Sequence, residues 1–166
     1  MNGLSGAKQN ILIDPGIITM IPGQYERDIA LSFRFKSDST RLLNALSIPE
    51  YVEVWLQTPD TGEQQFVFNH VAQDTFQMDL YRAEGYQASI YASCRVVGAN
   101  QVSYTWTTTS PLGTTETLVD IKLLCGSEGC VLALKHSGFK DAVESAWCRR
   151  MWHQSLEKLC RLIDKN

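Results

Sequence analysis

The sequence predicts an α+β domain in which a curved antiparallel sheet of seven strands wraps around one long C-terminal helix. The prediction depends on the order of the elements, which is a strand, two short helices, six strand-like runs and a final helix. Strands followed by a terminal helix are typical of layered α+β proteins. The separations between consecutive runs are short, which favours antiparallel hairpins. We expect the two short helices to close one end of the groove between sheet and long helix.

The C-terminal helix is predicted from Lys140 to about Asp164, because apolar residues recur there at three- and four-residue steps. The stripe that they form consists of Trp152, Leu156, Leu159 and Ile163. Such a long stripe must pack against more than one helix, and the strands before it are the available partner. The same face contains Ser145, Cys148 and Arg149, although a pure core face needs neither a serine nor an arginine. The prediction of a binding site starts from this mixture.

Residues 1–23 are predicted to form an N-terminal extension, and residues 24–166 the single domain. Two short apolar segments flank an Asp-Pro-Gly turn at 14–16. They are predicted either to add a strand or cover a sheet edge, or to form a loosely ordered tail. The apolar stretch at 11–21 is also a candidate surface for a homodimer. It is too short and too interrupted to cross a bilayer, so no membrane span is predicted.

The first strand is predicted at 25–35, where apolar and polar residues alternate with a period of two. N-cap residues at 37–39 precede leucines at helical spacing and predict the first short helix. The second short helix is predicted to begin at Pro49, because Ser47 and Glu50 have the spacing of a capping box and proline suits a first turn.

Six strand-like runs follow and are separated by residues typical of turns. They lie at about 64–71, 75–82, 86–97, 101–110, 115–124 and 130–136. Together with the first strand they supply the strands of the predicted sheet.

Composition and motifs exclude several classes of function. Fifteen basic and eighteen acidic residues give a net charge of −3, so nucleic acid is not predicted as a partner. The three histidines, His70, His136 and His153, show no metal-binding spacing. The chain contains no P-loop, dinucleotide fingerprint or nucleophile elbow. We therefore assign no metal, no cofactor and no catalytic residue from the sequence.

The five cysteines are an odd number and include no Cys-x-x-Cys pair, so neither a zinc site nor a secreted disulfide framework is indicated. Cys125 and Cys130 flank a Gly-Ser-Glu-Gly turn and are expected to face each other across a hairpin. We favour a reduced pair over a disulfide there. This interpretation predicts a reducing compartment, namely the cytoplasm.

Four segments of the sequence resemble a known superfamily. They are Leu43 to Glu50 followed by Trp55, Asn100 to Trp106, His136 to Phe139, and Trp152 to Leu159. In order and spacing they are similar to the START-like superfamily, also called SRPBCC, helix-grip or Bet v-like. Within it, they look most like the branch of the activator of the heat-shock-protein-ninety ATPase and the polyketide cyclases. The resemblance implies a mostly apolar cavity between the sheet and the long helix that binds small hydrophobic molecules.

Aromatic residues on the predicted strands and helices are the main candidates for the lining of that cavity, with several polar neighbours. The ligand-binding residues predicted from the sequence are Trp55, Phe68, His70, Met78, Tyr104, Trp106, Ser145, Arg149 and Trp152. The alternative is an ordinary, filled aromatic core. Arg149 is expected either to meet a ligand carboxylate or phenolate, or to lie on a solvated helix face. His70 is expected either to be a pocket acid or base, or to be hydrogen-bonded at a strand end.

Two functions from different classes are compatible with this fold. The first is a cofactor-free module that binds a hydrophobic or aromatic, lipid-like or polyketide-like small molecule. The second is a cyclase, dehydratase or hydrolase that uses the same cavity, with His70 or Tyr104 and Arg149 as the nearest acid–base candidates. A third alternative, suggested by the resemblance alone, is a partner protein of the chaperone ATPase.

Overall fold

The structure, a computed structural model, describes residues 27–57, 65–82 and 85–165. In these ranges the elements occur in the predicted order. The strands are β1 (Ile29–Phe35), β2 (Gln65–Ala72), β3 (Thr75–Arg82), β4 (Gly85–Val96), β5 (Gln101–Ser110), β6 (Gly113–Gly126) and β7 (Gly129–Ser137). The helices are α1 (Ser39–Ser47), α2 (Pro49–Trp55) and α3 (Ala142–Asp164). The α+β prediction is therefore confirmed.

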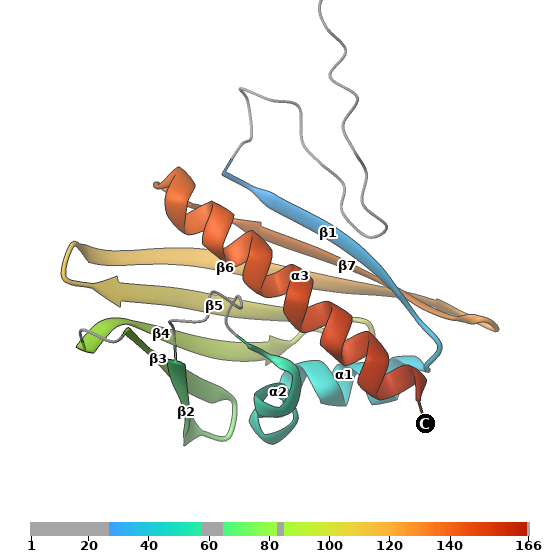
Figure 1. The fold of residues 1–166 in the computed structure, drawn as a ribbon. Coiled ribbons are helices and arrows are strands. Elements are labelled where there is room, and N and C mark those ends of the chain that lie inside the picture. The colour runs from blue at the N-terminus through green and yellow to red at the C-terminus, as the bar shows by residue number, and fades with distance from the viewer. Residues whose placement is uncertain (1–26, 58–64, 83–84, 166) are drawn as a thin grey trace, which may run out of the picture.

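The strands form one antiparallel sheet in the order β1-β7-β6-β5-β4-β3-β2. In Figure 1, α3 crosses one face of this sheet, and α1 and α2 lie near the C-terminal end of α3. The two short helices therefore close one end of the space between sheet and helix. The opposite end contains the beginning of α3 and the turn between β5 and β6, and no helix covers it in the described part of the chain.

The core lies between α3 and the inner face of the sheet, because the strands alternate buried and more exposed residues. On β5, for example, Val102, Tyr104 and Trp106 are buried, whereas their neighbours are half-buried or exposed. α3 contributes a buried stripe that includes the four apolar residues predicted from the sequence. The stripe consists of Ser145, Cys148, Met151, Trp152, Ser155, Leu156, Leu159 and Ile163.

The polar residues on this stripe tie the beginning of α3 to the beginning of β1. The Ser145 hydroxyl donates to the carbonyl of Arg27 at 2.6 Å. The Arg149 guanidinium donates to the carbonyl of Asp28 at 3.2 Å. These carbonyls belong to the chain just before β1, so the two side chains fix where the edge strand starts. This contact accounts for the serine and the arginine on an otherwise apolar face.

Two details of helix capping differ in outcome. Asp38 caps α1 by accepting from the Arg41 N–H at 2.8 Å, as the N-cap residues at 37–39 predicted. The capping box predicted between Ser47 and Glu50 is wrong, because α2 has Ile48 at its N-cap and no side-chain cap bond. The Ser47 hydroxyl instead donates to the carbonyl of Leu43 in the preceding helix at 2.6 Å.

The prediction of a reduced cysteine pair is also wrong. Cys125 and Cys130 face each other in the β6–β7 register, with Cα atoms 4.0 Å apart, and they form a disulfide. Their juxtaposition was expected, but the oxidised state was not. The reason for predicting a reducing compartment is therefore removed, and the cytoplasmic location stays a prediction.

The extension at 1–23 lies outside the described residues, and so does the candidate dimer segment at 11–21. Both therefore stay predictions. Among the described helices, none is long and apolar enough to cross a bilayer.

Candidate functional site: a cleft beside an aromatic core

Three tryptophans fill the middle of the space between sheet and helix. Trp55, Trp106 and Trp152 come from α2, β5 and α3, and each is at most 1% exposed. The ring centroids of Trp106 and Trp152 are 5.3 Å apart, and those of Trp55 and Trp152 are 6.5 Å apart. Contacts of this kind leave little room between the rings. This part of the interior is therefore a packed core.

A buried histidine connects the tryptophans to the sheet. The Trp152 indole N–H donates to His136 Nδ1 at 3.0 Å. Because Nδ1 accepts, the ring proton lies on Nε2, which donates to Thr117 Oγ1 at 2.7 Å. The Thr117 hydroxyl then donates to the Trp106 carbonyl at 3.2 Å. Burial lowers the pKa of His136 from 6.5 to about 3, so this histidine is neutral and structural.

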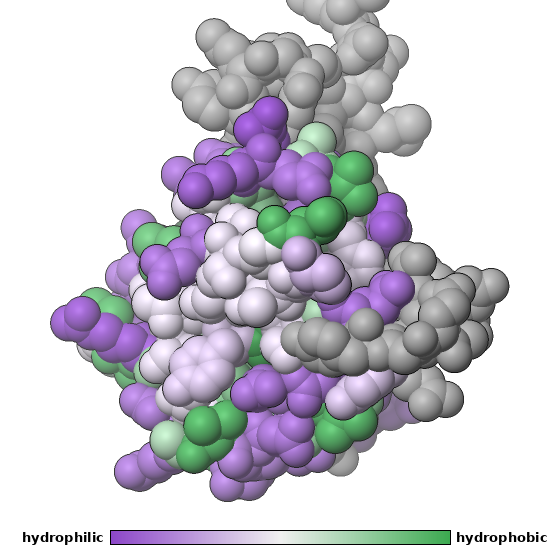
Figure 2. Space-filling model, turned by 90° about the vertical axis from the view of Figure 1, so that its left-hand side faces the viewer, coloured by the Kyte–Doolittle hydropathy of each residue, from purple (hydrophilic) through white to green (hydrophobic). Residues whose placement is uncertain are grey.

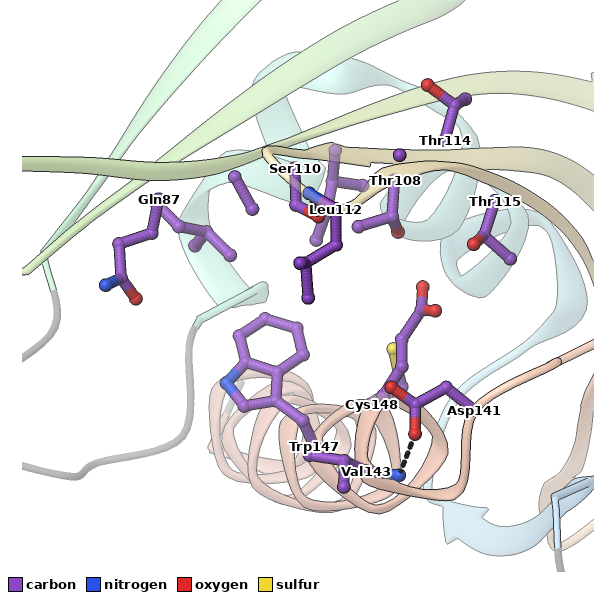
Figure 3. Close-up of a pocket in the computed structure, with 15 residues that line it drawn as sticks. Gln87, Thr108, Ser110, Leu112, Thr114, Thr115, Asp141, Val143, Trp147 and Cys148 are labelled. Atoms are coloured by element: carbon purple, nitrogen blue, oxygen red, sulfur yellow. Dashed lines mark hydrogen bonds between the residues drawn. The ribbon is translucent and has the colours of Figure 1, made fainter.

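A cleft of about 450 Å³ opens at the end of the molecule that the short helices leave uncovered. Its helix side is formed by Asp141, Val143, Glu144, Trp147 and Cys148, in and just before the first two turns of α3. Its sheet side includes Leu80, Ala88, Ile90, Thr108, Ser110 and Thr115. Figure 3 shows Trp147 on the helix side and Thr108 and Ser110 on the sheet side, with Leu112 of the β5–β6 turn between them.

The cleft exists because side chains on the inner face become smaller toward this end of the sheet. The inward residues of β5 change from Tyr104 and Trp106 to Thr108 and Ser110. Thr108 pairs with Ile90 on β4 and Thr115 on β6, so no large ring faces α3 in this row. Figure 2 looks onto this end and shows a centre of intermediate hydropathy, with apolar residues separated rather than gathered in one patch.

Two polar atoms inside the cleft make no hydrogen bond of good distance and angle with the described residues, although their side chains lie close to each other. They are Glu144 Oε1 and Thr108 Oγ1, and both atoms are buried. Burial raises the pKa of Glu144 above its ordinary value, the Thr108 hydroxyl opposes this effect, and the nearby Asp141 carboxylate adds to it. Burial also raises the pKa of the Cys148 thiol well above its usual range, so Cys148 is not a reactive thiolate.

None of the nine residues predicted from the sequence lines this cleft. Six of them are buried in the core, namely Trp55, Met78, Tyr104, Trp106, Ser145 and Trp152. Phe68 is half-buried and stacks on Phe76 with centroids 4.9 Å apart. Arg149 is half-buried against the backbone before β1. Whether any of the nine contacts a ligand stays a prediction.

His70 contacts two carboxylates of α2 instead of the cleft. Its Nε2 atom is 2.7 Å from Glu53, and its Nδ1 atom is 3.8 Å from Glu50. His70 is therefore a surface link between β2 and α2, which agrees with the alternative of a hydrogen-bonded histidine on a strand.

Sequence reasoning missed Glu144, Thr108 and Trp147. Glu144 is near the beginning of the helix, where an acidic residue suits the helix dipole, but it also lies four residues before Cys148 and therefore on the same stripe. A carboxylate on a buried stripe was the available signal. Thr108 was hidden in a run of threonines on β5 that gives no apolar pattern. In the described ranges, no group of three or more His, Cys, Asp or Glu side chains is arranged to hold a metal ion.

Comparison with known proteins identifies the fold. No family model and no curated protein matches the chain. Among solved structures, protein CV1439 from Chromobacterium violaceum is similar over 84% of this chain and 99% of its own, with 22% identity and a TM-score of 0.68. The AHSA1 protein from Silicibacter pomeroyi is similar over 81% and 95%, with 18% identity and a TM-score of 0.63. The Aha1 dimer from Colwellia psychrerythraea is similar over 82% of this chain and 96% of its own, with 15% identity and a TM-score of 0.58.

These similarities confirm the START-like helix-grip fold and the likeness to AHSA1-type structures predicted from the sequence. At such low identity they identify the fold and not the activity. The function therefore has to be inferred from the cleft.

Proposed function

We propose that the chain binds an apolar small molecule in the cleft between α3 and the β4–β6 part of the sheet. The observation that carries the proposal is the cleft of about 450 Å³, which combines an apolar wall with two buried, unpartnered polar atoms. Ligand sites commonly have this size and composition. Leu80, Ala88 and Ile90 supply apolar contacts from the sheet, and Trp147 supplies them from the helix.

Apolar burial supplies most of the affinity in this proposal. A ligand that buries about 250 Å² of apolar surface gains about 6 kcal/mol before the cost of ordering it. The Glu144 and Thr108 side chains contribute orientation, because a polar ligand group near them satisfies atoms that otherwise lack partners.

The experiment is to fill the cleft. Ala88 is half-buried and lines the cleft, so Ala88→Trp is expected to weaken binding of 4-phenyl-1-butanol at least tenfold, as measured by calorimetry. The matched control is Ala133→Trp, because Ala133 is exposed on β7 and does not line the cleft. Equal binding by both variants and the wild type contradicts the proposed site. Thermal unfolding of each variant checks that it is folded.

An enzyme is the second candidate, and the Glu144 carboxyl favours it. Its raised pKa is a property that general acids share, and Thr108 lies next to it. The acid–base candidates predicted from the sequence receive no such support. His70 contacts Glu53, and burial raises the pKa of Tyr104 well above its usual range. A catalytic role predicts that Glu144→Gln abolishes turnover of a bound substrate while binding persists; unchanged turnover excludes it.

A partner role in a chaperone ATPase cycle and a homodimer remain further predictions. One similar structure is named as a dimer, and two carry the names AHSA1 and Aha1. Analytical ultracentrifugation of the full chain and of a chain lacking residues 1–23 tests the homodimer. A monomer in both cases contradicts it.

A further inference from the structure

We infer that the ligand of the cleft carries a positively charged amine, placed beside Glu144 at the beginning of α3. This inference rests on the proposed function and adds the chemical class of the ligand. Charge, unpartnered acceptors and an aromatic ring in the cleft support it, and each is a separate observation.

The charged groups of the cleft are acidic. Asp141 and Glu144 line it, and none of the described lining residues is a lysine, arginine or histidine. The remaining polar lining side chains are neutral: the amide of Gln87, several hydroxyls, the Trp147 indole and the Cys148 thiol. A carboxylate ligand therefore meets charges of its own sign at short range, whereas an ammonium group meets charges of the opposite sign.

The acceptors are placed where an ammonium group can use several of them. Glu144 Oε1 and Thr108 Oγ1 are both buried, and neither makes a hydrogen bond of good distance and angle, although the Thr108 hydroxyl is close enough to Glu144 to lower the pKa of its carboxyl. An alkylammonium has three N–H donors and no acceptor, so it can donate to both oxygens at once. A neutral alcohol has one donor and satisfies one of them.

Trp147 adds an aromatic face to the same cleft. Figure 3 shows its ring projecting into the space opposite the sheet, on the side where Leu112 approaches. The face of an indole ring attracts cations, and the attraction strengthens when water is excluded. Carboxylates together with an indole are a combination that suits organic cations better than neutral molecules.

The beginning of a helix normally attracts anions, which is the main objection to a cationic ligand. Here the N-cap position is already occupied by the chain's own carboxylate, because Asp141 Oδ1 accepts from the Val143 N–H at 2.8 Å. The helix end carries about half a positive charge, whereas Asp141 and Glu144 carry up to two negative charges. The local field therefore still favours a cation.

The test uses three probes of one shape: 4-phenylbutylamine, 4-phenyl-1-butanol and 4-phenylbutyrate. By calorimetry at pH 7, the amine is expected to bind at least about tenfold more tightly than the alcohol, and the carboxylate most weakly. Glu144→Gln removes the charge but keeps the shape. It is expected to weaken the amine about tenfold and to change the alcohol less than about twofold.

The matched control is Glu116→Gln, an equal change of charge at an exposed position of β6 that does not line the cleft. It is expected to leave all three affinities unchanged. Two outcomes overturn the inference but leave the proposed function intact. The first is equal affinity for the amine and the alcohol, and the second is tightest binding of the carboxylate. If none of the three probes binds, the inference and the proposed function both fail.

A pH series with the wild type decides the matter if Glu144→Gln does not fold. The titratable groups of the cleft are Asp141, Glu144 and Cys148, and the groups that face Glu144 from the sheet are neutral hydroxyls and apolar side chains. Amine affinity is expected to rise with pH as Glu144 loses its proton, at a higher pH than an ordinary carboxyl does, while alcohol affinity stays level. A flat profile for the amine overturns the inference. A fall with rising pH also overturns it, and identifies a protonated Glu144 that donates to a carbonyl ligand.

Discussion

The buried His136 makes the stability of this protein depend on pH in a way that one substitution removes. Its pKa is about 3 in the folded chain against 6.5 for an ordinary histidine. Below pH 6.5 the unfolded chain therefore binds a proton at His136, whereas the folded chain keeps this side chain neutral until the pH approaches 3. Protonation would also place an N–H on Nδ1, opposite the Trp152 N–H that it now accepts. Because the pKa of His136 is lower in the folded chain than in the unfolded chain, the free energy of unfolding is expected to fall as the pH drops below the pKa of an ordinary histidine.

The size of the effect follows from the pKa difference. Each pH unit between the two values contributes about 1.4 kcal/mol, so His136 alone accounts for a loss of about 2 kcal/mol between pH 7.5 and 5. When the pH reaches the pKa of the folded state, the loss in the free energy of unfolding is about 5 kcal/mol, which is comparable to the whole stability of many domains.

Urea unfolding of the wild type and of His136→Asn at these two pH values is the measurement. The asparagine has no titrating group, and its Oδ1 atom can still accept from the Trp152 N–H. The variant is expected to be less stable at pH 7.5 but to lose about 2 kcal/mol less than the wild type on acidification. His70→Asn is the control for replacing a histidine at an exposed position outside the core. Equal losses in the wild type and His136→Asn would refute the reasoning.

Three further predictions concern stability. Trp152→Phe is expected to lower the free energy of unfolding by about 1–3 kcal/mol more than Trp106→Phe. The first substitution leaves a buried nitrogen of His136 without a donor, whereas the Trp106 N–H has no partner among the described residues. Equal losses of stability in urea unfolding contradict this prediction. Asp141→Ala removes the N-cap of α3 and is expected to cost about 1 kcal/mol, and unchanged amide exchange in the first turn contradicts it. Reducing the Cys125–Cys130 disulfide, which closes a short loop, is expected to cost about 2 kcal/mol, and an unchanged Tm with reductant contradicts it.

The fold was predictable because its signals are long and repeated. The alternation of β1 and the helical stripe ending at Ile163 each extend over many residues, and the structure has both. Local polar contacts were less predictable, because their partners are distant in sequence. Ser47 has the spacing of a capping box, yet its hydroxyl bonds backward to Leu43. Arg149 has the position of a ligand contact, yet it bonds to a carbonyl 121 residues away.

The residues predicted on β5, Tyr104 and Trp106, lie on the same face of the sheet as the proposed cleft but in neighbouring rows. Periodicity places Trp106 and Thr108 on the same side of β5, and it cannot say where side chains stop filling the interior. That depends on how rings from α2 and α3 meet those of the sheet, which is a property of the packed molecule. Large aromatic residues attract attention in a sequence, whereas open space in a structure is left by small ones such as Ala88.

The three tryptophans fill the interior next to the cleft, although none of them lines it. On β5, Trp106 lies one row further into the molecule than Thr108, is fully buried and packs against Trp152. A ligand in the cleft therefore cannot extend further into the interior, because these rings already occupy it. In a homologous series of alkyl ligands, each added methylene should strengthen binding only until the chain reaches the indole rings. The extra methylenes of longer ligands then stay in water and add no affinity.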